Sequence, residues 1–172
     1  MSTNREVIAA IRAHHDQLSR DLVSRSLAVQ GGVDRLAAGD DARAGLVAFL
    51  HEELLPHAAA EEKTLYAAGA DLPATRLLVA AMVAEHRVLE GLVDDLAGAR
   101  TPSDVAGTAA ALRTLFLTHL AKENDLLLPA LDESGADLGS LLAGMHELLG
   151  DSHDEVERQE SGCGCGGCAC GG

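Results

Sequence analysis

Residues 50–65 read LHEELLPHAAAEEKTL, and this stretch decides how the whole chain is interpreted. Its residues Leu50, Leu54, His57, Glu61 and Leu65 are three or four positions apart, so they share one face of a helix. That face would bury an imidazole and a carboxylate among leucines. Such groups need partners, because burying an unpaired polar group is costly and burying a bare charge costs more. The stretch therefore predicts a helix that carries a polar site into the core.

The same spacing recurs twice further along the chain. His86 lies four residues before Glu90, and His119 lies four residues before Glu123. His15 has no glutamate four residues later, but it is in register with the apolar residues of the N-terminal segment. Four predicted helices thus each turn a histidine inward, and together they can assemble imidazoles and carboxylates in one core.

The composition favours an all-α protein of one domain. The chain has 172 residues, 47% of them apolar, with only two Phe, one Tyr and no Trp. Its core must therefore be aliphatic, and Leu and Ala are strong helix formers. The net charge of −14 argues against nucleic acid and anionic membrane surfaces as partners. No N-terminal apolar run resembles a signal peptide, so the expected location is the cytoplasm.

The apolar periodicity predicts an up-down-up-down four-helix bundle with a short C-terminal fifth helix. Gly31-Gly32 should end the first helix, and Pro56 should bend the second just before His57. The alternative at Pro56 is a break, with His57 in the first turn of a new helix. Thr101 followed by Pro102 is typical of a helix start. The expected helices span residues 4–30, 40–68, 74–97, 102–128 and 138–149.

The C-terminal segment differs from the bundle in composition. We expect the bundle to occupy residues 1–150, followed by a polar and then Gly/Cys-rich flexible tail at 151–172. All four cysteines lie in this tail, at Cys163, Cys165, Cys168 and Cys170. Four thiolates so close together could bind zinc or copper, or form reversible disulfides, and they make a second, weaker candidate site.

The inward-facing set predicts a metal centre in the bundle. Its candidate ligands are His15, His57, Glu61, His86, Glu90, His119 and Glu123. These are too many for one tetrahedral zinc, and they suit two six-coordinate ions bridged by carboxylates. Imidazole and carboxylate ligands suit iron, and also zinc or manganese. The Glu-x-x-His pattern of ferritin-like bundles and the His-Glu-x-x-His pattern of zinc proteases are both absent.

Residues 5–149 resemble the hemerythrin-like, or HHE cation-binding, domain. The resemblance rests on the lone histidine near the N-terminus and on the sequences HAAAE, EH and HLAKE in that order. This resemblance implies a four-helix bundle holding two non-haem irons that bind O2 or related small ligands. It further implies that His15, His57, His86 and His119 are terminal ligands and that Glu61 and Glu123 bridge the irons.

The chain departs from the oxygen carriers of this family in two places. Their third helix offers His-x3-His, where this chain has Glu90, and their fourth offers His-x4-Asp, where it has His119-x3-Glu123. Glu90 could ligate iron, or it could accept a hydrogen bond from an iron-binding imidazole and orient that ring. An added carboxylate should favour the ferric state and weaken reversible carriage of O2.

Three classes of function follow from the sequence. The first is a protein that binds or senses O2, peroxide or nitric oxide, or that handles iron. The second is a di-iron oxidoreductase that consumes peroxide or nitric oxide with an unknown redox partner. The third is a structural bundle without metal. No catalytic nucleophile or base stands outside the predicted ligand set.

Overall fold

The structure, a computed structural model, describes residues 3–35 and 40–160. Helices are the regular secondary structure of these residues, and they contain no strand. Its helices are α1 (Asn4–Asp34), α2 (Asp40–Phe49), α3 (Leu55–Lys63), α4 (Leu65–Ala70), α5 (Arg76–Gly98), α6 (Pro102–Lys122), α7 (Leu128–Glu133) and α8 (Leu138–Glu160). Two π-helical turns, η1 (Leu50–Leu54) and η2 (Glu123–Leu127), join α2 to α3 and α6 to α7. Among the described residues, no helix is both long and apolar enough to cross a membrane.

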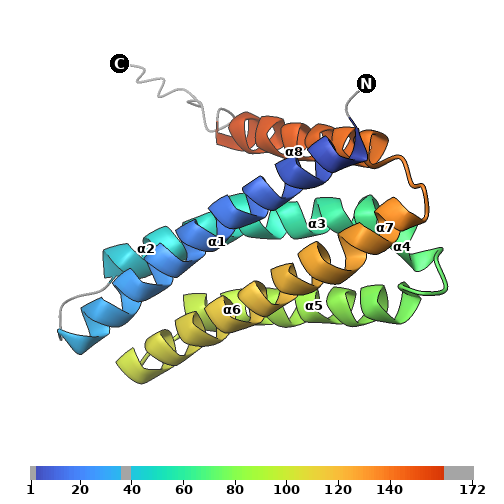
Figure 1. The fold of residues 1–172 in the computed structure, drawn as a ribbon. Coiled ribbons are helices and arrows are strands. Elements are labelled where there is room, and N and C mark those ends of the chain that lie inside the picture. Colours follow the sequence, from blue (N-terminus) through green and yellow to red (C-terminus); the bar gives the residue numbers. More distant parts are fainter. Residues whose placement is uncertain (1–2, 36–39, 161–172) are drawn as a thin grey trace, which may run out of the picture.

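These helices form a bundle (Figure 1). Helix α6 packs against α1 and α5, and α2 packs against the same two helices, with α3 continuing from it beside α5. Helix α8 lies along one side of the bundle, against α1 and α3.

Helix α1 begins and ends for different reasons. Thr3 caps its N-terminus in a capping box with Glu6, so two backbone N–H groups at that end are satisfied. The predicted end at Gly31-Gly32 is wrong, because the helix continues to Asp34. A glycine inside a helix costs only about 1 kcal/mol relative to alanine, and the burial of Val29 and Gly32 against the bundle offsets it.

The bend predicted at Pro56 takes the form of the π-helical turn η1. The turn is closed by the Leu55 N–H, which donates to the Leu50 carbonyl five residues back. Pro56 then occupies the first turn of α3, where its missing N–H needs no partner. The expected continuation to residue 68 is interrupted at Thr64, where φ is −123° and ψ is −86°. The Thr64 hydroxyl donates to the Ala60 carbonyl at 2.7 Å, a contact that bends helices.

The end of α6 uses the same device. The η2 turn is closed by the Leu128 N–H donating to the Glu123 carbonyl, and Pro129 sits in the first turn of α7. Thr101 caps the start of α6 as predicted, accepting a hydrogen bond from the Asp104 N–H at 3.2 Å. After α7 the chain reverses at Gly135, whose φ of +78° is a conformation that favours glycine.

Helix α8 is longer than predicted. It starts at Leu138 but runs to Glu160, eleven residues past the expected end at Leu149. Residues 151–160 are polar, yet they contain no Gly or Pro, and adding residues to an existing helix is far easier than starting one. The cysteine segment of the predicted tail lies outside the described residues.

Two apolar clusters fill the bundle, one on each side of a polar layer. The first cluster includes Leu18, Leu54, Leu89 and Phe116. The second cluster includes Ile11, Ala60, Met82 and Leu127. Helices α1 and α5 contribute to both clusters, and α3 and α6 do so together with the adjoining turns η1 and η2. The histidines are therefore held in a layer closed by aliphatic side chains above and below.

Leu112→Ala should lower the free energy of unfolding by about 2–5 kcal/mol, because it opens a cavity in the first cluster. Leu112 is 0% exposed. The matched control is Leu117→Ala on the same helix, at a side chain that is 38% exposed, which should cost about 1 kcal/mol or less. Urea denaturation of both variants measures the difference. Equal losses would contradict the assignment of Leu112 to the core.

Candidate metal centre

Six of the predicted site residues meet in the polar layer. They are His15, His57, Glu61, His86, His119 and Glu123, each between 1% and 3% exposed. Helix α1 supplies one histidine, α3 a histidine and a glutamate, α5 a histidine, and α6 with the start of η2 a histidine and a glutamate. Four segments far apart in sequence thus place imidazoles and carboxylates in one closed volume.

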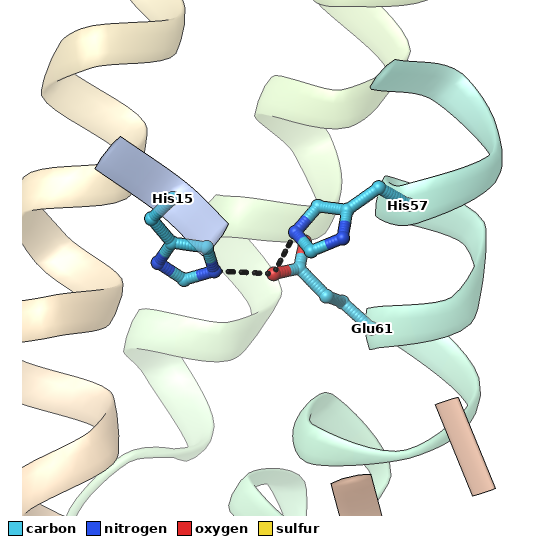
Figure 2. A group of neighbouring side chains, drawn as sticks. All are labelled: His15, His57 and Glu61. Carbon is cyan, nitrogen blue, oxygen red and sulfur yellow. Dashed lines mark ion pairs between the residues drawn. The ribbon is translucent and has the colours of Figure 1, made fainter. Parts of the chain in front are cut away.

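Glu61 lies between the histidines of three helices. Its Oε1 is 2.9 Å from Nε2 of His57 and 3.3 Å from Nε2 of His15. Figure 2 shows both rings turned toward this carboxylate from opposite sides. The other oxygen, Oε2, is 3.9 Å from Nε2 of His86. One carboxylate therefore faces two separate groups of imidazoles.

Glu123 spans the same two groups from the other side. Its Oε2 is 3.8 Å from Nε2 of His15, and its Oε1 is 3.5 Å from Nε2 of His119. Nε2 of His86 and Nε2 of His119 are 3.0 Å apart. Two imidazole nitrogens this close repel each other unless a proton or a cation lies between them, so the second group is also built around positive charge.

Tyr66 of α4 also belongs to the site. Its ring is 1% exposed and its hydroxyl donates to Oε1 of Glu123. The hydroxyl oxygen of Tyr66 is 2.8 Å from Nε2 of His119 and 3.4 Å from Nε2 of His86. The phenol thus lies at the group formed by His86 and His119.

The outer ring nitrogens of three histidines are held by polar side chains. Nδ1 of His15 donates to Oδ1 of Asn124 at 2.9 Å. Nδ1 of His86 donates to Glu62 at 2.8 Å, and Nδ1 of His119 donates to Glu85 at 2.9 Å. These contacts fix the tautomer and leave Nε2 of each ring free to bind a cation in the layer.

The charges in the layer shift one another's titration. Burial would raise the pKa of Glu61, but His57 and His15 hold it well below its ordinary value of 4.5. Burial would lower the pKa of His15, but Glu61 and Glu123 raise it above 6.5. Glu123 and Glu85 raise the pKa of His119 in the same way. Burial, together with the charges of Glu61 and Glu123, raises the pKa of Tyr66 and keeps the phenol protonated.

The donor set fits metal ions because several of its atoms have no other partner. Nε2 of His15 and of His57, Oε1 of Glu61 and Oε2 of Glu123 are buried without a hydrogen bond of acceptable geometry. Buried polar atoms are rarely left so, and each is costly. Two triads, His15–His57–Glu61 and Glu61–His86–His119, each have one ligand atom per residue within 4.8 Å of the others. The residues can therefore hold two cations that share Glu61.

Glu90, the seventh predicted site residue, does not join the cluster. Its side chain is exposed on α5. The buried face of α5 runs through Met82, His86, Leu89 and Val93, which places the next inward position after His86 at Leu89. Position 90 is turned about 100° from position 89, since each residue rotates a helix by that amount. The carboxylate expected to add charge near the ions is absent from the layer.

His14, His51 and His146 lie outside the layer, and their side chains are exposed. His14 still contacts the site from outside, since its ring centroid is 4.8 Å from that of His57. Cys163, Cys165, Cys168 and Cys170 lie outside the described residues, and their role stays a prediction.

Sequence reasoning missed Tyr66 and the outer acceptors Asn124, Glu62 and Glu85. One signal for Tyr66 was available, because it is the sole tyrosine of an aliphatic chain and a buried phenol needs a partner. A second signal was position, since Glu62 and Asn124 directly follow the inward glutamates and Glu85 directly precedes His86. The sequence could not show which histidine each would reach, because every one of these contacts crosses between helices.

Comparison with known proteins agrees with the geometry. Residues 6–131 match the family described as the hemerythrin HHE cation binding domain. The chain belongs to this family. No curated protein and no solved structure gave a match. The family match covers the four segments that build the layer, and it ends before α8. Cation binding by the His/Glu layer is therefore the activity that fold and family share.

The metal-free protein should lose stability as the pH rises above 6.5, the ordinary pKa of histidine. The raised pKa values of His15 and His119 stabilise the fold below 6.5, and this contribution is lost as the pH rises through them. The lowered pKa of Glu61 contributes above 4.5 and is lost only in acid. Bound metal should reverse the trend, because it displaces these protons more easily at high pH. Thermal unfolding with and without chelator at several pH values measures both slopes.

An unchanged or rising melting temperature of the metal-free protein over that pH range would contradict the arrangement of charges described here.

Proposed function

We propose that this protein is a non-haem di-iron protein of the hemerythrin family that binds, senses or reacts with a small ligand such as O2, peroxide or nitric oxide, or that handles iron. The observation that carries the proposal is the pair of buried triads that share Glu61, with unpartnered ligand atoms facing one another. Two cations at these positions would compensate the buried carboxylates. Imidazole with carboxylate and no thiolate in the layer favours iron.

Each residue has a distinct task in this proposal. His15 and His57 would hold one ion, His86 and His119 the other, and Glu61 and Glu123 would bridge them. Bound iron supplies the ability to change oxidation state and to accept a small ligand at an open position. The protein excludes bulk water from that position, because the two apolar clusters close the layer on both sides.

The context of the site is part of the proposal. We take the bundle to be an up-down-up-down four-helix unit working in the cytoplasm, with the small ligand as its partner and with neither nucleic acid nor membrane involved. We also propose that the Gly/Cys segment binds zinc or copper or forms reversible disulfides, on the basis of its four closely spaced thiols.

Metal analysis of protein purified without added metal should find two irons per chain. Glu61→Ala should lose at least one of them, because Glu61 belongs to both triads. The matched control is Glu90→Ala, which removes an exposed carboxylate from a neighbouring helix and should keep both irons. Elemental analysis and the ligand-to-metal charge-transfer bands in the near ultraviolet report the result. Wild-type protein free of metal, with a melting temperature insensitive to chelator, would instead identify a structural bundle.

A second candidate function, an oxidoreductase that consumes peroxide, is favoured by Tyr66. Its phenol keeps a proton inside the water-poor layer and donates it to Glu123. Disproportionation of hydrogen peroxide needs such a group, because two H2O2 give two H2O and one O2 only if protons move between the oxygens. Tyr66 is placed to hold and return one of these protons.

Tyr66→Phe should leave two irons bound but lower the rate of peroxide consumption about 100-fold, the size of effect typical of a lost general acid. The variant keeps the ring and removes one oxygen, and no other tyrosine is present to replace it. Oxygen release and iron content are measured on the same sample. Wild-type protein that binds azide or nitric oxide tightly but turns over no peroxide would favour a carrier or sensor.

A further inference from the structure

The two halves of the layer are built on the same plan. His57, Glu61, Glu62 and Leu65 are spaced like His119, Glu123, Asn124 and Leu127. His57, Glu61, His119 and Glu123 face the layer, and Leu65 and Leu127 are buried in the second cluster. His15 of α1 and His86 of α5 then complete the two halves.

The hydrogen bonds from outside the layer follow this plan. The residue after each bridging glutamate holds a histidine on another helix, so Glu62 accepts from His86 and Asn124 accepts from His15. The residues directly before His86 and His15 lie against the other two histidines of the layer, His119 and His57. Glu85 accepts from Nδ1 of His119, and His14 lies with its ring centroid 4.8 Å from that of His57.

The two halves share this spacing of residues, but they differ in the charge of the groups that contact the outer sides of the histidines. The pair His86 and His119 is held by two carboxylates, Glu62 and Glu85, of which Glu85 is also paired with Lys122. The pair His15 and His57 is held by a neutral amide and flanked by an imidazole, which is never an anionic acceptor. One half therefore carries more negative charge directly behind its ligands than the other.

The outer side of His57 also lacks an anchor. Its Nδ1 is buried and has no hydrogen-bond partner among the described residues. Beside it is a cavity of about 150 Å³ between α1, α3 and α8, lined by Ile11, His14, His57, Leu142, Met145 and His146. The matching place in the other half is occupied by Glu85 and Lys122. His57 is thus less restrained than His119.

A carboxylate that accepts from the outer N–H of a ligand imidazole makes the inner nitrogen a better donor and fixes its direction. Loss of such a partner typically weakens metal binding about 10- to 100-fold. The phenol of Tyr66 lies at the same half as the two carboxylates, which adds a further polar group there. The carboxylates behind His86 and His119 therefore favour tighter binding of an ion at that half.

We propose that the two metal positions are unequal, with a tight position at His86 and His119 and a weaker, exchangeable one at His15 and His57, and that Glu62, Glu85 and Asn124 are the positioning residues that set the difference. The inference rests on the proposed function, because it requires two ions. It predicts that the His86/His119 position fills first, and that the position beside the cavity fills second and releases its ion first.

The test is titration of metal-free protein with Co2+, followed by calorimetry and by the visible absorption of the bound ion. Wild-type protein should bind two ions in two steps whose affinities differ at least 10-fold. His57→Ala should abolish the weak step and keep the tight one, and His119→Ala should do the opposite. Two ions bound in one step of equal affinity would overturn the inference but leave the proposed function intact. Failure to bind two ions would overturn both.

Two variants exchange the positioning groups between the halves. Asn124→Asp gives His15 a carboxylate and should tighten the weak step about 10-fold without changing the tight step. Glu62→Gln replaces the carboxylate behind His86 by an amide and should weaken the tight step by a similar factor. The affinities of the two steps then converge in either variant. Unchanged affinities in both variants, with helix content equal to wild type by circular dichroism, would overturn the role given to these residues.

Discussion

The structure depends on the pairing of two buried carboxylates, Glu61 and Glu123, with positive charge. Neither side chain can reach water, and neither finds enough protein hydrogen bonds to compensate its charge. In the metal-free chain, raised pKa values at His15 and His119 provide part of the compensation through protons. Metal ions would provide it with higher charge, held by the inward Nε2 atoms and carboxylate oxygens. The same constraint explains why all four histidines face one layer and why the layer is closed by aliphatic side chains.

The helix irregularities serve this layer. Each π-helical turn adjoins a glutamate-bearing segment: η1 ends just before His57 and η2 begins at Glu123. Such turns add a residue to a helix and re-aim the side chains that follow, and they are frequent at functional sites. The prolines behind them fit without losing a hydrogen bond. The helix break at Thr64 then redirects the chain so that Tyr66 enters the layer beside Glu123.

The chain differs from a symmetrical two-metal bundle in its outer contacts. Carboxylates support one pair of histidines, whereas an amide and a cavity lie behind the other. Unequal ions are useful for reactions with small molecules, because one ion can hold the protein together while the other exchanges its ligands. The additional helix α8, which lies beyond the residues matched by the family, covers the half that contains the cavity.

The sequence by itself determined the helical class, the approximate helix positions and the inward His/Glu pairs at 57/61 and 119/123, because these follow from periodicity along one helix. It also predicted that His15 and His86 face inward, because apolar residues precede and follow each of them on the same helix face. Glu90 shows where such reasoning stops, since spacing alone cannot tell whether the buried face turns toward position i+3 or i+4. The extents of α1 and α8 depended on burial and on helix propagation rather than on local breakers. Tyr66, Asn124, Glu62 and Glu85 were decided only by the tertiary structure, because each acts on a histidine of another helix and such distances exist only once the helices have packed.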